Sequence, residues 1–172
     1  MTILIAGGGI AGLAFALTCH ELGQDVEVLE AARDIQPLGV GINLQPNAIR
    51  ELYQLGLEQE LRKIGVEAEE WALSFGLFEE EAHPVWSEPR GSAAGYNWPQ
   101  FSVHRGHFQQ LLLDAVRERL GEDRVTPNAR LLSYKSSDQD ITAQFATAEG
   151  TTFSRNGTLL VGADGIHSQV RK

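Results

Sequence analysis

The chain has 172 residues, 42% of them apolar and 22% charged, a composition typical of one globular domain rather than of a disordered segment. Fourteen basic residues against twenty-three acidic ones give a net charge of −9, so no basic field is present to hold nucleic acid or an anionic membrane surface. The charge does not exclude binding of a small phosphorylated ligand, because backbone N–H groups at a helix N-terminus bind a pyrophosphate without any lysine.

The N-terminal segment and the single cysteine indicate a reducing compartment. Cys19 lies in an apolar helical pattern without a partner, which excludes a disulfide framework and is typical of a buried side chain. The apolar stretch from Ile3 to Leu17 is too short to span a bilayer, and the first basic residue is Arg33, so the stretch does not resemble a secretory signal. The sequence predicts a cytoplasmic protein with no membrane partner.

The first thirty residues predict a strand, a helix and a second strand. The apolar run Thr2–Ala6 is typical of a buried parallel strand, and the glycine cluster "GGGIAG" follows it directly. The segment "LAFALTCHELG" keeps helical periodicity as far as Gly23, and Val26–Leu29 is rich in β-formers. This order predicts a βαβ unit.

The middle of the chain predicts one long helix and then an excursion out of the first layer. Residues 31–45 have the composition of a loop, and Asn47 after Pro46 is a favourable N-cap for a helix that continues to about Gly65. Residues 66–104 contain all three tryptophans, in short β-like runs separated by turns. Clustered aromatic residues more often form core than line an aromatic-substrate pocket, and both interpretations stay open for Trp71, Trp86, Tyr96, Trp98 and Phe101.

The last third of the chain predicts a helix followed by antiparallel strands. Residues 106–120 have helical periodicity and end at Gly121. Four short segments follow, from "RVT" at 124–126 to "GTTFSRN" at 150–156, and the polar turns between them predict an antiparallel meander. A strand over Thr158–Val161 then leads to "GADG" at 162–165, and a helix is predicted to begin near Ile166.

The glycine cluster has the spacing of a dinucleotide-binding turn. Gly7, Gly9 and Gly12 form G-x-G-x-x-G between a strand and a helix, where the first permits a tight turn, the second lets a pyrophosphate approach and the third lets the helix pack closely. Glu30 ends the second strand, eighteen residues after Gly12, where its carboxylate would accept hydrogen bonds from the ribose hydroxyls of an adenosine. Because Glu30 would repel a 2′-phosphate, the pattern indicates NAD or FAD rather than NADP.

Five ordered motifs resemble one enzyme family: "GGGIAG", "LEAARD", "PLGVGINLQPNAI", "HRGHFQQLLLDAV" and "VGADGIHSQVR". They are similar to the N-terminal part of the FAD-dependent aromatic hydroxylases, flavoprotein monooxygenases with a p-hydroxybenzoate hydroxylase-like fold. Stretches such as "WSEPRG" and "YNWPQFSVHRG" look particularly like the phenazine-modifying members. The resemblance implies an α/β fold: a Rossmann-like FAD-binding domain with an added antiparallel meander and the start of a substrate domain, with the C-terminal part absent. Residues 1–172 would be the N-terminal part of the FAD-binding domain, and 66–104 a partial substrate-domain excursion.

The resemblance also implies a set of FAD-binding residues. The glycine turn, including Ala11, would contact the pyrophosphate, Glu30 with the adjacent Ala31 would hold the ribose, and the segment around Gly41 and Ile42 would pass beside the flavin. Arg33 and Arg105 match basic residues near the cofactor, although a structural ion pair is the alternative for each. Asp164, in the Asp-Gly motif, would help to hold FAD. The implied set is Gly7, Gly9, Ala11, Gly12, Glu30, Ala31, Arg33, Gly41, Ile42, Arg105 and Asp164.

The activity that the resemblance implies is hydroxylation of a small aromatic, phenazine-like substrate with FAD, O2 and NAD(P)H as co-substrate. The family's second flavin motif, a Gly-Asp pair, does not occur here, so the chain alone is expected to be inactive and to retain FAD weakly or not at all. No residue is a defensible catalytic acid or base, and His104 with His107 lacks further ligands for a metal site. Two functions stay as alternatives to the monooxygenase: an FAD-dependent oxidase or dehydrogenase, and a non-catalytic nucleotide-binding module. The oligomeric state stays open.

Overall fold

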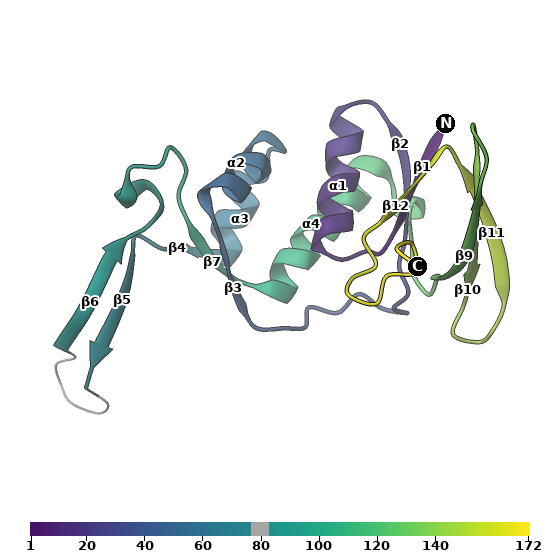
Figure 1. Ribbon diagram of the computed structural model, residues 1–172. Coiled ribbons are helices and arrows are strands. Elements are labelled where there is room, and N and C mark those ends of the chain that lie inside the picture. Colours follow the sequence, from purple (N-terminus) through teal and green to yellow (C-terminus); the bar gives the residue numbers. More distant parts are fainter. Residues whose placement is uncertain (77–82) are drawn as a thin grey trace. The chain divides into compact units, whose positions relative to one another are not determined.

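The computed structural model describes residues 1–76 and 83–172 (Figure 1). The chain forms two compact units, one made of Met1–Leu38 with Phe108–Lys172 and the other of Gly39–His107. The first unit contains the predicted dinucleotide-binding turn and the second contains the tryptophan-rich region. The extent of a substrate-domain excursion at 66–104 stays a prediction.

A parallel sheet forms the centre of the first unit. Its order is β12 (Leu159–Gly162), β1 (Thr2–Ala6), β2 (Asp25–Leu29) and β8 (Val125–Thr126), and each neighbouring pair is parallel. Helix α1 (Ile10–Glu21) connects β1 to β2 and buries Leu13 and Leu17, which confirms the predicted βαβ unit. Cys19 is buried on this helix, as predicted.

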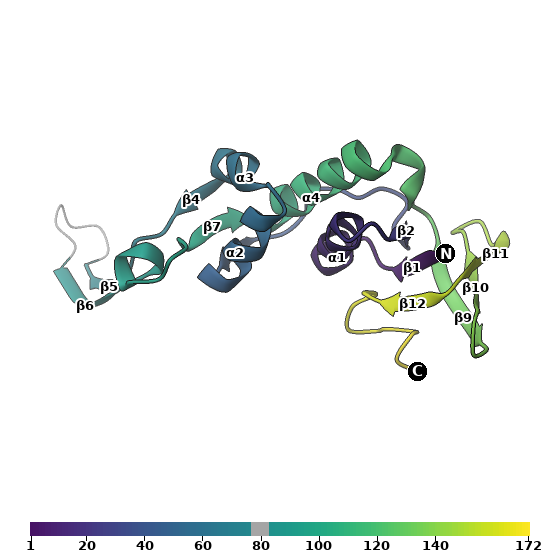
Figure 2. The ribbon, with the colours of Figure 1, turned by 90° about the horizontal axis from the view of Figure 1, so that it is seen from above.

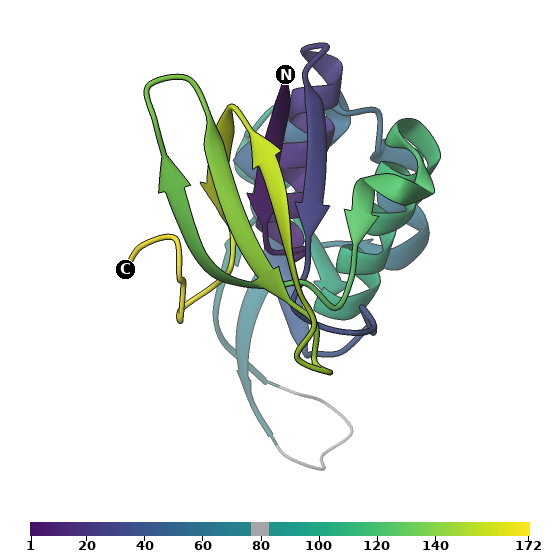
Figure 3. The same cartoon turned by 90° about the vertical axis from the view of Figure 1, so that its right-hand side faces the viewer.

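A three-stranded antiparallel meander covers one face of the parallel sheet, and α1 covers the other (Figure 3). The meander consists of β9 (Arg130–Ser136), β10 (Ile141–Ala146) and β11 (Thr152–Gly157). A shared core joins the two layers and contains Leu4, Leu29 and Leu160 from the parallel strands with Leu131 and Phe145 from the meander. Buried apolar side chains therefore hold the meander against the strands that position the glycine turn.

The predicted meander needed one correction. The segment "RVT" is not its first strand, because Val125 and Thr126 form β8 and pair in parallel with Val28 and Leu29 of β2. Val125 is buried there, and the short η2 turn (Glu122–Arg124) brings it to the sheet from helix α4 (Arg105–Leu120). Two residues are too few to show strand alternation, so the sequence could not distinguish the two sheets.

The C-terminal segment also differs from its prediction. No helix begins near Ile166; residues 163–172 form turns and bends. The Asp164 carboxylate accepts hydrogen bonds from the N–H groups of Gln169 and Val170, so the segment folds back on a side chain instead of continuing as a helix.

The second unit is built on a small antiparallel sheet in the order β3 (Gly41–Leu44), β7 (Phe101–His104) and β4 (Gly65–Glu67). The predicted loop at 31–45 is therefore wrong for residues 41–44, which pair with β7. Helices α2 (Pro46–Gln54) and α3 (Glu58–Ile64) lie beside these strands (Figure 2).

The single helix predicted for residues 47–65 is broken at Gly56. Its φ of 70° lies in the left-handed region, and its N–H donates to the carbonyl of Tyr53 while the N–H of Leu57 donates to that of Leu52. Leu57 is buried directly after the break, so burial of its side chain stabilises the change of direction that Gly56 permits.

Strands β5 (Glu70–Phe75) and β6 (His83–Pro89) form a two-stranded sheet, followed by the 3-10 turn η1 (Gly91–Ala94). Trp71 and Trp86 meet edge to face across it, with ring centroids 5.0 Å apart. Both rings are about half exposed and Tyr96 is 62% exposed, so the core interpretation is wrong for these three residues, whereas Phe101 is buried. The pocket interpretation stays a prediction.

Candidate cofactor site

The glycine turn joins β1 to α1 at the carboxyl edge of the parallel sheet. The N–H of Gly7 donates to the carbonyl of Leu29, and Gly7 has a φ of 110°, which favours glycine. A Cβ on Gly7 would overlap the carbonyl oxygen of Ala163 in the segment after β12, and a Cβ on Gly12 would overlap that of Gly7. Two of the three predicted glycines are therefore required by packing within the protein.

The third predicted glycine, Gly9, faces open space. A Cβ there would meet no atom within 4 Å. Gly9 is the N-cap of α1, no side chain caps the helix, and its first turn contains no acidic residue. Within the described part of the chain, the N–H groups of Ile10, Ala11 and Gly12 therefore have no side-chain acceptor, and with the helix dipole they favour an anion at this end.

Glu30 organises this turn as well as ending β2. One carboxylate oxygen, Oε2, accepts the N–H of Gly8 at 2.6 Å, and the other, Oε1, accepts the N–H of Ala32 at 2.7 Å. A carboxylate oxygen can accept more than one hydrogen bond, so both oxygens keep capacity for hydroxyl donors. Glu30 is partly exposed, as a contact with a ribose requires.

Gln109 contacts the same turn and was not singled out from the sequence. Its side-chain Nε2 donates to the carbonyl of Gly8 over 2.9 Å, from a position on α4 that is 101 residues away in the chain. No local pattern could have revealed this contact, because it depends on how α4 packs within the first unit.

Asp164 lies beside the glycine turn because β12 and β1 are parallel neighbours that end together, with Ala6 opposite Gly162. Its Oδ2 accepts the N–H of Gln169 at 2.6 Å, whereas its Oδ1 is buried and has no hydrogen-bond partner among residues 1–76 and 83–172. Burial raises the pKa of this carboxyl, but the Ser168 hydroxyl and the backbone N–H groups around it outweigh burial, and the pKa lies below its ordinary value. Asp164 is therefore an anion with one buried oxygen that has no hydrogen-bond partner among these residues.

Arg33 has the structural partner that was its alternative interpretation. Its guanidinium lies 2.6 Å from Oε1 of Glu149, and both side chains are more than half exposed. The pKa of Glu149 is below its ordinary value, mainly because the Asn128 side chain donates to it, with a smaller contribution from Arg33. Ala31 is next to Glu30 in the chain. A role of Arg33 toward a nucleotide stays a prediction.

The remaining predicted residues belong to the second unit. The N–H of Arg105 donates to the carbonyl of Val40, its side-chain stem lies against Gly39, and Gly41 pairs with His104. Gly41, Ile42 and Arg105 are thus close neighbours. The Arg105 guanidinium is exposed and forms no ion pair within the described part of the chain, so it is available to an anionic ligand.

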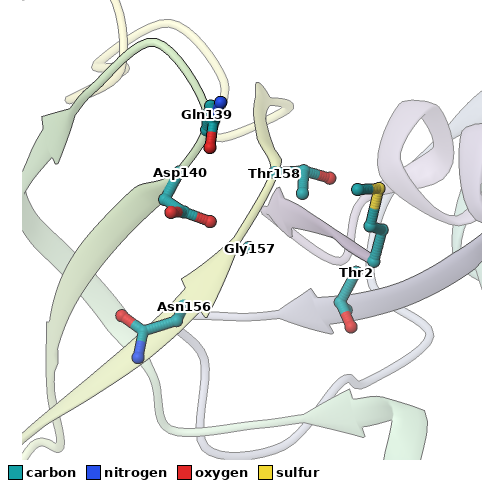
Figure 4. A pocket seen from close by; sticks show the side chains of 7 residues that line it. Thr2, Gln139, Asp140, Asn156, Gly157 and Thr158 are labelled. Carbon is teal, nitrogen blue, oxygen red and sulfur yellow. The ribbon is translucent and has the colours of Figure 1, made fainter.

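A separate hollow of about 680 Å³ lies at the opposite end of the parallel sheet, where β1 begins. Its lining consists of Met1, Thr2, Gln139, Asp140, Asn156, Gly157 and Thr158 (Figure 4). It includes none of the predicted residues.

The described residues contain no group of three or more His, Cys, Asp or Glu side chains that could hold a metal ion. No helix among them is long and apolar enough to cross a membrane.

Comparisons with known proteins agree with this geometry. The family model described as "FAD binding domain" matches residues 1–172. Phenazine 1,6-dicarboxylic acid hydroxylase from Lysobacter antibioticus is 46% identical over 98% of the chain, and aurachin C monooxygenase/isomerase from Stigmatella aurantiaca is 31% identical over 99%. The chain spans 41% and 42% of the length of these relatives.

Solved structures show the same fold. The p-nitrophenol 4-monooxygenase from Pseudomonas putida DLL-E4 superposes with a TM-score of 0.85 at 21% identity, over 99% of this chain and 43% of that one. A flavin-dependent monooxygenase in complex with FAD and substrate superposes with a TM-score of 0.81 at 17% identity, over 99% of this chain and 31% of that one. The α/β prediction is confirmed.

Proposed function

Because this chain belongs to the FAD-binding domain family of the flavin-dependent monooxygenases, we propose that it is the FAD-binding portion of an enzyme that hydroxylates an aromatic, phenazine-like substrate. One observation carries the cofactor part of the proposal: an uncapped helix N-terminus, Glu30 and the unpartnered oxygen of Asp164 meet at one edge of the parallel sheet. The 46% identity to a phenazine 1,6-dicarboxylic acid hydroxylase supports the substrate class.

The pyrophosphate, the ribose and the flavin ring of FAD each have a suitable partner in this proposal. The N–H groups at the start of α1 bind the pyrophosphate, and the free lone pairs of Glu30 accept the ribose hydroxyls. Asp164 accepts a hydroxyl hydrogen bond through Oδ1, and Arg105 donates to an anionic or carbonyl oxygen of the cofactor. Gly41 and Ile42 supply backbone that a flat ring can approach closely.

Bound FAD would supply the redox chemistry of hydride transfer from NAD(P)H and dioxygen activation, and the residues of this chain would bind and orient it. The carboxylate of Glu30 would repel a 2′-phosphate, so the adenosine end of this site takes FAD and the nicotinamide cofactor acts only as a co-substrate. We assign no residue of this chain as a catalytic acid or base.

Cofactor binding is tested by titrating the purified chain with FAD and following the quenching of flavin fluorescence. We expect saturable binding that Glu30→Ala weakens. The matched control is Glu60→Ala, which removes an exposed carboxylate in the second unit. A chain that stays colourless and leaves flavin fluorescence unchanged would contradict the proposal that it holds FAD. That result would favour the alternative function, a non-catalytic nucleotide-binding module.

The reaction class is tested by supplying FAD, NADH or NADPH, 18O2 and phenazine-1,6-dicarboxylate to the complete enzyme of which this chain is proposed to be the FAD-binding portion. Incorporation of one 18O atom into the phenazine, with consumption of one reduced nicotinamide, is the expected result. Hydrogen peroxide as the sole product of oxygen would instead identify the FAD-dependent oxidase alternative.

A further inference from the structure

The peptide groups on both sides of Gly8 are held by side chains from distant parts of the chain. The N–H of Gly8 donates to Glu30 at 2.6 Å, and its carbonyl accepts from Gln109 at 2.9 Å. Gly8 is buried, so these two bonds satisfy polar groups that water does not reach. Gly8 occupies a variable position of the G-x-G-x-x-G pattern, for which the pattern itself specifies no contact.

The bond from Gln109 determines where the next N–H group points. The carbonyl of Gly8 and the N–H of Gly9 belong to one planar trans peptide, so they point in opposite directions. When Gln109 holds the carbonyl oxygen on one side, the N–H of Gly9 faces the other. That N–H has no acceptor within the described residues, and the space around Gly9 is open.

Among residues 1–76 and 83–172, no other hydrogen bond reaches the Gly8–Gly9 peptide; the nearest is in the following peptide, where the carbonyl of Gly9 accepts the N–H of Leu13 at 3.0 Å. Gly7 is fixed against Ala163, and the helix begins only after Gly9. A Cβ on Gly8 would lie 3.0 Å from the Cβ of Glu30, so Glu30 restricts the peptide on its N-terminal side. On the C-terminal side, Gln109 provides the hydrogen bond.

We propose that Gln109 is a positioning residue: by holding the carbonyl of Gly8, it fixes the N–H of Gly9 in the direction of the cofactor's pyrophosphate before the cofactor arrives. The part that concerns the pyrophosphate rests on the proposed placement of FAD at this turn. Preorganisation of this kind raises affinity because the ordering cost is met in the free protein.

The test compares Gln109→Met with Gln110→Met. Methionine has nearly the same length as glutamine and donates no hydrogen bond. Gln110 lies on the same turn of α4, and its amide donates only to Asp114 at 2.7 Å, so its replacement controls for general effects on the helix. Gln109→Asn is a second variant that keeps an amide but is one methylene too short.

The first measurement is made without ligand. The 15N relaxation of the Gly9 amide is expected to show fast, large-amplitude motion in Gln109→Met and Gln109→Asn, and wild-type rigidity in Gln110→Met. A Gly9 amide that is as rigid in both Gln109 variants as in the wild type would overturn the inference. This result does not depend on FAD, so it decides the role of Gln109 even if the chain proves unable to bind the cofactor.

The second measurement compares ligands by calorimetry. Gln109→Met is expected to bind FAD and ADP roughly tenfold more weakly, equivalent to the loss of about one hydrogen bond, while adenosine binding stays unchanged. Adenosine lacks the phosphates that Gly9 would contact, so an equal loss for adenosine would show a merely structural role and contradict the proposal. Failure of the wild-type chain to bind FAD or ADP would contradict the proposed function separately.

Discussion

Two glycines of the same turn, Gly9 and Gly12, are required for different reasons. Gly12 has no room for a side chain because a Cβ would overlap the carbonyl oxygen of Gly7, whereas Gly9 has open space around it and an extended backbone with a φ of −76°. The restriction at Gly12 acts in the free protein. The restriction at Gly9 appears only when a ligand occupies the open side.

Alanine substitutions separate the two requirements. Gly12→Ala is expected to lower the free energy of unfolding by about 1–3 kcal/mol, because the turn must open to admit the Cβ. Gly9→Ala should cost less than about 1 kcal/mol as a change of N-cap, but should weaken FAD binding by blocking the approach of the pyrophosphate. Urea denaturation and FAD titration of both variants measure these effects; equal stability losses would contradict the assignment.

The depressed pKa of Asp164 makes part of the stability dependent on pH. The folded pKa lies below the unfolded value, so the stabilisation is complete at neutral pH, begins to fall near the unfolded pKa of about 3.9 and is lost as the pH drops through the folded value. Asp164→Asn should therefore be less stable than the wild type at pH 7, with a difference that shrinks below about pH 4. Urea denaturation at pH 7, 5 and 3 tests this, and a constant difference would show that protonation of Asp164 is not responsible.

At the scale of elements, one polar contact joins the meander to the parallel sheet in addition to their shared core. Nε of Arg155 on β11 lies 2.8 Å from Oε1 of Glu27 on β2, and the Thr126 hydroxyl also donates to that oxygen. The Glu27 side chain is only 16% exposed, so loss of Arg155 would leave a largely buried carboxylate without its ion pair.

Arg155→Met is expected to destabilise the chain by about 1–2 kcal/mol. The control is Arg33→Met, which breaks the exposed Arg33–Glu149 pair and should cost no more than about 0.5 kcal/mol. Chemical denaturation of the two variants gives the comparison. An Arg155→Met protein as stable as Arg33→Met would show that apolar contacts alone hold the meander.

Local patterns predicted the elements that depend on near neighbours. The βαβ unit followed from glycine spacing and apolar periodicity within thirty residues. The break at Gly56 was missed because the apolar pattern continues across it, and "RVT" was assigned to the wrong sheet because its partner, β2, lies 97 residues earlier, with Val28 opposite Val125. The side-chain anchors of Gly8 are likewise products of tertiary packing, so the sequence predicted which residues form the turn but not how it is held.

At the scale of the whole molecule, the proposed cofactor residues are divided between the two units. The glycine turn, Glu30 and Asp164 belong to the first, whereas Gly41, Ile42 and Arg105 belong to the second. The FAD affinity of a variant tests the assignment of each residue by itself. Arg105 is the best probe, because it is exposed and its backbone is anchored to Val40 within its own unit.

Arg105→Met should weaken FAD binding by roughly tenfold or more, because a charge-assisted hydrogen bond is lost. Arg50→Met is the matched control: it removes an exposed arginine of the second unit that pairs with Glu51, and it should leave FAD affinity unchanged. Flavin fluorescence titration gives both dissociation constants, and thermal melting without ligand should be alike for the two variants. If Arg105→Met binds FAD as tightly as Arg50→Met, the first unit holds the cofactor without Arg105. If both variants bind more weakly, the effect comes from the lower positive charge rather than from a contact. Only a loss confined to Arg105→Met assigns Arg105 a contact with FAD.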